Sequence, residues 1–120
     1  AVGVGGCVDV GRSLGGGSIQ RVVNAPPPAC DALQTPATYP INFAVLTARG
    51  VQAVVVSEGE VRAAMRLAFA RLRLVLEPGG AAALAAVMAG KVPVGEHTLV
   101  TLSGGNVDPD QFAAVLTEAA

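Results

Sequence analysis

The residues best placed to do chemistry lie in one short turn near the end of this 120-residue chain, Ser103-Gly104-Gly105-Asn106. The turn follows an expected strand and precedes an expected helix, and ligands of open α/β sheets bind at such carboxyl ends of strands. Paired glycines allow a ligand to approach the backbone closely, and a serine hydroxyl can both donate and accept a hydrogen bond. The turn therefore predicts a ligand site, although an ordinary strand-to-helix turn would also use glycine for its backbone angles.

The other potentially reactive side chains favour simpler interpretations. His97 is the only histidine, and it precedes an expected strand without an acid or nucleophile partner, so it is interpreted as a surface residue. Cys7 and Cys30 are far apart and lack metal-ligand spacing, which favours small buried apolar residues. Lys91, the sole lysine, directly follows a glycine that ends an expected helix, and is expected to be solvated.

The elements that must position the turn alternate between apolar runs and segments with helical periodicity. Strands are expected at residues 1–4, 19–23, 53–56 and 98–102, and helices at residues 8–14, 41–49, 58–73, 81–89 and from 109 onward. The unbroken apolar run at 53–56 is typical of a strand buried on both faces of a parallel sheet. This order predicts α/β architecture with a largely parallel sheet and flanking helices.

Two helix starts are specified by capping residues. Ser57 and Glu60 form an S-x-x-E capping box, and Asp108 precedes Pro109 in the arrangement of an N-cap and first turn. The apolar residues of the first helix recur on one face, namely Val61, Ala64, Met65, Ala68 and Leu72. Its arginines occupy another face, which we interpret as solvated rather than as an anion site, namely Arg62, Arg66 and Arg73.

Composition excludes several classes of protein. Hydrophobic residues make up 52% of the chain and charged residues 14%, so a core can form and disorder is excluded. Eight Lys and Arg against nine Asp and Glu give a net charge of −1 without a basic block, which argues against nucleic-acid binding. The longest apolar stretch is shorter than the ~20 residues that span a bilayer, and no secretion signal is visible. We expect a single cytoplasmic unit over residues 1–120.

Several strings along the chain carry a family resemblance. Residues 102–108, Leu-Ser-Gly-Gly-Asn-Val-Asp, resemble the C-terminal signature of the fold-type II, pyridoxal-phosphate-dependent threonine/serine dehydratases, whose relatives include serine racemase. Residues 74–81 resemble the E-P-[ST]-G-A turn of that family, and residues 54–72 resemble its strand-helix unit. Residues 31–36 are similar to its D-G-L-x-T-P loop, with Ala32 where glycine is usual. The similarity covers almost the whole chain in the right order.

The resemblance implies the C-terminal portion of a large α/β domain like that of the tryptophan synthase beta subunit. It implies pyridoxal 5′-phosphate as cofactor, L-threonine or L-serine as substrate, and β-elimination to a 2-oxo acid and ammonia in a homo-oligomeric enzyme. Ser103 would hydrogen-bond the pyridine nitrogen, and Gly104, Gly105 and Asn106 would shape the turn. Glu77 would either lie near the cofactor pocket or hold the turn structurally.

The sequence also departs from the family pattern. The S-x-K-x-R-G segment with the cofactor lysine is absent, and so is the G-G-G-G-L phosphate loop, while residues 15–18 are interpreted as a plain linker. We therefore expect a C-terminal fragment of about one-third of the enzyme, inactive by itself. A non-catalytic interaction module or subunit is the alternative, and an unrelated small α/β domain that binds another anion is a third.

Metal binding is not expected. Family members often hold a divalent cation through a Glu and an Asp after the first strand, and Asp9 falls at the Asp position. The Glu position holds glycine, either Gly3 or Gly5. One carboxylate is a weak site for a cation that prefers six or more oxygens. Asp9 is therefore expected to cap a short helix.

Overall fold

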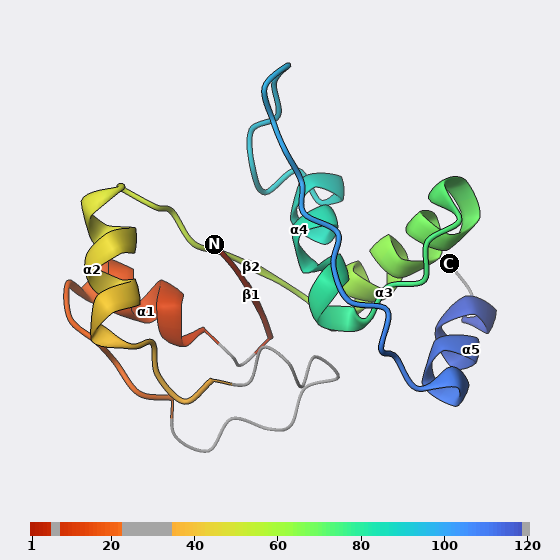
Figure 1. Cartoon of the computed structure of the whole chain (residues 1–120), viewed down its shortest axis with the longest axis horizontal. Helices are drawn as coiled ribbons and strands as arrows, with labels where there is room; N and C mark the ends of the chain where they lie inside the picture. The colour runs from red at the N-terminus through yellow and green to blue at the C-terminus, as the bar shows by residue number, and fades with distance from the viewer. Residues whose placement is uncertain (6–7, 23–34, 119–120) are drawn as a thin grey trace.

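The computed structural model of the chain describes residues 1–5, 8–22 and 35–118. Cys7, Cys30 and most of the loop at 31–36 lie outside the described residues. The elements are β1 (Val2–Val4), α1 (Asp9–Gly16), α2 (Pro40–Ala48), β2 (Val54–Val56), α3 (Glu58–Leu67), the π-helix η2 (Ala68–Leu72), α4 (Pro78–Met88) and α5 (Pro109–Thr117). The two strands lie between α1 and α2 on one side and the remaining helices on the other (Figure 1).

The sheet consists of β1 and β2, which pair in parallel with Val2 opposite Val54 and Val4 opposite Val56. Side chains alternate across a strand, and here Val4 and Val56 are buried on the face that packs against α4. Val55 points to the other face and is 45% exposed. The expected strands at 1–4 and 53–56 and their parallel pairing are therefore confirmed, with one face of the sheet covered and the other open.

The capping box at the start of α3 is confirmed. The Glu60 amide donates to the Ser57 hydroxyl oxygen at 3.2 Å, and the Ser57 amide donates to the Glu60 carboxylate at 2.7 Å. These two bonds satisfy amides that have no partner within the helix. The buried face of this helix is also as expected except at one residue, because Leu72 is half exposed.

The misplaced Leu72 has a structural cause. From Ala68 to Leu72 the helix continues as a π-helix, with hydrogen bonds between residues five apart. This wider turn rotates the residues after it away from the apolar stripe of α3. The segment ends at Arg73, which has a left-handed backbone with φ of 59°, so Arg73 does not share the helix face of the other arginines.

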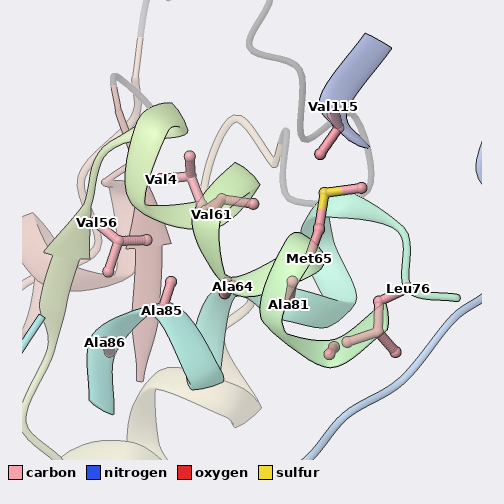
Figure 2. Close-up of a cluster of buried hydrophobic side chains, with 12 residues drawn as sticks. Val4, Val56, Val61, Ala64, Met65, Leu76, Ala81, Ala85, Ala86 and Val115 are labelled. Carbon is pink, nitrogen blue, oxygen red and sulfur yellow. The ribbon is translucent and has the colours of Figure 1, made fainter. Parts of the chain in front are cut away.

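The core lies between the sheet, α3 and α4 (Figure 2). It consists of small aliphatic side chains around one methionine, namely Val4, Val56, Val61, Ala64, Met65, Ala68, Leu76, Ala81, Ala82, Ala85, Ala86 and Val115. Four of these are alanines of α4, and their small size lets this helix approach α3 and both strands closely. The scarcity of aromatic residues is thus matched by tight packing of alanine and valine.

Several helix boundaries differ from the expected ones. Helix α4 begins at Pro78, three residues early, because proline suits the first turn, where its absent amide is not needed. Helix α1 extends through Gly16 and ends at Gly17 with φ of 69°, so the glycines interpreted as a linker partly belong to the helix. Helices α2 and α5 also begin at prolines, Pro40 and Pro109, and Asp108 caps α5 by accepting a hydrogen bond from the Gln111 amide at 2.9 Å.

Two expected strands are wrong. Residues 98–102 are irregular, and Leu99 is 92% exposed rather than buried. Residues 19–22 are irregular too, and residue 23 lies outside the described residues. A strand exists only where a neighbour accepts its backbone hydrogen bonds, and β1 and β2 are the only strands in the described part of the chain.

Candidate functional site

The Ser103-to-Asn106 turn lies against the start of α4. A Cβ atom placed on Gly80, in the first turn of α4, would overlap the carbonyl oxygen of Ser103. Gly80 is buried, so this backbone-to-backbone contact belongs to the packed interior. Only glycine permits such an approach, because the atoms in conflict are backbone atoms that cannot rotate away.

Glu77 joins the turn to the same helix start. Its amide donates to the Gly104 carbonyl oxygen at 2.8 Å. Gly104 has φ of 70°, and a Cβ atom there would collide with the Glu77 carboxylate. Backbone and side-chain contacts thus hold together two segments that are distant in the sequence, since Glu77 bonds Gly104 and Gly80 contacts Ser103.

The turn presents its polar groups outward. Ser103 and Asn106 are exposed, whereas Leu102 and Val107 on either side are half-buried. Within the described residues, the Ser103 hydroxyl has no hydrogen-bond partner. The backbone of Ser103 is therefore fixed by Gly80, while its hydroxyl is open to a ligand.

Helix α5, which follows the turn in the sequence, is attached to α3 and η2. Arg62 and Arg66 of α3 each bind Glu118 at 3.1 Å, and Arg66 also donates to the Val115 carbonyl oxygen at 3.3 Å. The ring of Phe112 packs edge to face against the ring of Phe69, with the ring centroids 5.5 Å apart. The two arginines expected to be solvated thus attach α5 to α3.

Asp9 does not cap α1. The helix begins after Val8, and the Asp9 carboxylate is buried and accepts a hydrogen bond from the Thr35 hydroxyl at 3.1 Å. It connects α1 to the segment before α2. No group of three or more potential metal ligands occurs among the residues that the structure describes.

Lys91 was expected to be solvated, but its side chain is bound to two neighbouring groups. Its Nζ atom donates to the Glu60 carboxylate at 2.6 Å and to the Val55 carbonyl oxygen at 2.9 Å. The Lys91 ammonium and the Ser57 amide hold the pKa of Glu60 below its ordinary value, because both favour the charged carboxylate. His97, by contrast, is a surface residue as expected, beside Glu96.

A hollow on the open face of the sheet was not expected from the sequence. It is lined by the two strands, the first turns of α1 and Thr35. Gly3 and Val55 contribute from the strands, and Asp9 and Arg12 contribute from α1. The period-two alternation of the strands could have indicated an outward-facing Val55, but not that its face is open.

The chain matches the family of pyridoxal-phosphate-dependent enzymes over residues 1–104. It belongs to this family. The match confirms the resemblance seen in the sequence, and with it the fold-type II α/β fold class and the family cofactor, pyridoxal phosphate.

Individual relatives agree with this membership. The chain is 29% identical to the serine racemase of Dictyostelium discoideum over 115 residues, which cover 92% of this chain and 35% of the relative. It is 38% identical to the phenylserine dehydratase of Ralstonia pickettii over 85 residues, which cover 69% of this chain and 26% of the relative. The chain therefore spans between about a quarter and about a third of the length of these relatives.

Solved structures share the fold. The T.th. threonine deaminase is 36% identical with a TM-score of 0.78, covering 89% of this chain and 40% of that one. Maize serine racemase is 24% identical with a TM-score of 0.75, and the match covers 92% of this chain and 35% of that one. At this identity the likeness supports the fold alone. None of the described helices is long and apolar enough to cross a membrane.

Proposed function

We propose that this chain forms the C-terminal part of the large domain of a pyridoxal-phosphate-dependent threonine/serine ammonia-lyase. The observation that carries the proposal is the exposed Ser103 hydroxyl on a backbone fixed by Gly80 and Glu77. Relatives named as a phenylserine dehydratase and an L-threo-3-hydroxyaspartate ammonia-lyase support elimination from a hydroxy-amino acid as the reaction class.

The residues of the turn fit one part of the cofactor. The Ser103 hydroxyl, which has no partner among the described residues, can hydrogen-bond the pyridine nitrogen. Gly104 and Gly105 let the turn pack closely against the Glu77 carboxylate and the Val75 carbonyl oxygen. Gly104, Gly105 and Asn106 would then shape the turn, and Glu77 would hold it through the Gly104 carbonyl. The cofactor supplies an electron sink for the α-carbon of the amino acid when it is bound.

Ser103 would set the strength of that electron sink. A neutral hydroxyl does not hold the ring nitrogen protonated, as a carboxylate would, so the ring stores less negative charge. Elimination needs little stored charge, because the electron pair of the broken Cα–H bond forms the Cα=Cβ double bond as hydroxide leaves with the Cβ–O electron pair. A serine at this position therefore suits a dehydratase acting on L-threonine or L-serine.

The isolated chain should bind the cofactor weakly and catalyse nothing. Its single lysine, Lys91, is bound to Glu60 and Val55, and the sequence has no G-G-G-G-L loop for the phosphate. Mixing the purified chain with pyridoxal phosphate and L-threonine should give neither the absorbance of bound cofactor nor a 2-oxo acid. Turnover by these 120 residues would contradict the proposed fragment character.

The positive test is a hybrid enzyme. Replacing the corresponding 40% of the T.th. threonine deaminase with this chain should preserve ammonia release from L-threonine. In that hybrid, Ser103→Ala should lower kcat about 2- to 10-fold, since a hydrogen bond between neutral groups contributes ~0.5–1.5 kcal/mol. Ser103→Thr keeps a hydroxyl and serves as the control. An unaffected Ser103→Ala hybrid would remove the role assigned to this side chain.

A non-catalytic interaction module is the second candidate. The specific observation in its favour is the apolar but exposed helix α2, none of whose residues is buried. Ile41 and Val45 of this helix are exposed, and so is the preceding Tyr39. A hybrid that folds and binds cofactor but never turns over threonine or serine would favour this candidate.

A further inference from the structure

Helix α5 is attached to the rest of the molecule by few apolar contacts. It packs mainly on α3, at one end of the molecule (Figure 1). Of the residues of α5, all of which the structure describes, Val115 alone is buried, and its side chain points toward Met65 (Figure 2). Phe112 adds the edge-to-face contact with Phe69. Because the buried apolar area is small, the hydrophobic effect contributes little to this attachment.

The packing between α5 and its neighbours is also loose. A cavity of about 70 Å³ lies between α5, α3 and the start of α4. Its lining is mainly apolar, with Val61 and Met65 from α3 and with Ala114 and Val115 from α5. Side chains that face a cavity gain less dispersion attraction than side chains in a filled interior. The cavity therefore weakens the packing of α5 on α3.

Charged groups hold the C-terminal end of α5. The Glu118 carboxylate binds both Arg62 and Arg66 of α3, each at 3.1 Å. Arg66 also donates to the Val115 carbonyl oxygen at 3.3 Å, where the end of a helix favours positive charge. The three charged side chains are between 24% and 42% exposed, so dissolved salt screens their interactions. The attachment of α5 thus depends on charge and weakens as ionic strength rises.

We propose that α5 is a latch that opens locally while α3, α4 and the sheet stay folded, and that Glu118 keeps this latch closed. The helix has 9 residues. Isolated helices shorter than ~12–15 residues are marginal in water, so α5 loses its helical hydrogen bonds when it leaves α3. Opening loosens the nearby turn at Asn106, whereas Gly80 still holds the backbone of Ser103. Access of a cofactor to the loosened turn rests on the proposed function, but the latch itself does not.

Amide hydrogen exchange measures this opening without cofactor or activity, so the latch and the proposed function can fail separately. The protected amides of α5 should exchange at least ~10-fold faster than those of α4, because local opening exposes the first set alone. Raising the NaCl concentration from about 0.05 M to about 0.5 M should accelerate α5 exchange a further 2- to 10-fold or so, after correction for intrinsic exchange. Amides of α5 as protected as those of α4, or an α5 rate independent of salt, would overturn the proposal.

A substitution at the end of α5 tests the role of Glu118. Glu118→Gln removes the charge at the same size and should accelerate α5 exchange about 3- to 10-fold at low salt, as expected for the loss of two exposed ion pairs. The response of the variant to salt should be much smaller than that of the wild type. Glu96→Gln is the matched control, because Glu96 is an exposed carboxylate beside His97, and it should leave α5 exchange unchanged. Wild-type exchange in Glu118→Gln would overturn the proposal.

A second pair of variants tests the cavity. Ala114→Leu places additional atoms in the cavity and should slow α5 exchange about 2- to 10-fold, because filling a cavity stabilises the closed state. Ala113→Leu makes the same change of helix propensity at an exposed neighbour that is not among the cavity-lining residues. It should leave the exchange rate near that of the wild type. Equal rates for the two leucine variants would contradict the seating of α5 over the cavity, and with it the latch.

Discussion

At the scale of single residues, Gly80 decides how closely the Ser103 turn approaches α4. The contact is between backbone atoms, and neither partner can move without shifting an element. The backbone amide of Glu77 adds a hydrogen bond to the same turn. Glu77 is only half-buried, so its flexible side chain can change position more easily than a backbone atom can. The position of the candidate cofactor-binding hydroxyl therefore depends on the absence of a side chain at residue 80.

Gly80→Ala should destabilise the chain by about 1–3 kcal/mol, the usual cost of forcing extra atoms into a packed site. The matched control is Gly59→Ala, another helical glycine, where the added Cβ would be 3.9 Å from the Ser57 Oγ atom. That substitution should be neutral or stabilising by up to about 1 kcal/mol, because alanine favours helices. Urea unfolding of both variants checks the prediction, and equal stabilities would contradict the close contact.

Glu60 gives the chain a pH-dependent contribution to stability. Its pKa in the folded chain is below the ordinary value of 4.5, so folding favours the charged form. The contribution is complete above the unfolded pKa and is lost as the pH falls through the lowered one. The difference in unfolding free energy between the wild type and Glu60→Gln should therefore be largest near neutrality and shrink below about pH 4.5. A difference that stays constant from neutrality down through this range would contradict the prediction.

At the scale of elements, the sequence predicted those features whose cause is local. The capping box of Ser57 and Glu60 and the N-cap Asp108 depend on residues three positions apart, and both are present. Helix ends at Gly50 and Gly90 follow in the same way, because both glycines have positive φ. Local hydrogen bonds of this kind can be recognised without knowing the rest of the fold.

Features that depend on distant partners were not predictable in the same way. The apolar run at 98–102 has strand composition, yet no described strand lies beside it to accept its hydrogen bonds. The contact of Gly80 with Ser103 and the bond of Lys91 to Val55 join segments more than 20 residues apart. The motifs predicted a cofactor site at Ser103 with Glu77 either near it or holding the turn, but they did not indicate the close contact between Gly80 and Ser103.

The packing of α3 on α4 depends on Met65, the largest fully buried side chain. Met65→Ala should lower the unfolding free energy by about 2–5 kcal/mol, because a cavity replaces the side chain in a core otherwise built from small residues. Met88→Ala is the matched control, since Met88 at the end of α4 is largely exposed. Thermal or urea unfolding distinguishes them, and similar losses for both would contradict the location of the core.

At the scale of the whole molecule, the two faces of the sheet differ in how far helices cover them. Helix α4 covers one face of the sheet, while the hollow on the other face is bordered by α1. Leu74, Val75, Val94 and Leu99 are exposed apolar residues outside the helices. Exposed apolar surface of this extent favours association with another polypeptide.

Leu99→Ser should leave the unfolding free energy within about 0.5 kcal/mol of the wild type, as surface substitutions usually do. It should also reduce association of the chain at high concentration, since Leu99 is 92% exposed. Light scattering at matched concentrations, beside urea unfolding, measures both quantities. A large loss of stability would mean that Leu99 is packed in solution.

The hydrogen-bonded turn of the π-helix at Ala68–Leu72 contains one more residue than a turn of an α-helix. A homologue without that extra residue would align with a single-residue gap at this point, while β2 and α4 stayed in register. The length of this segment can therefore be scored in each relative separately from percentage identity. It could group the dehydratases and racemases by descent where substitutions have become too many to compare.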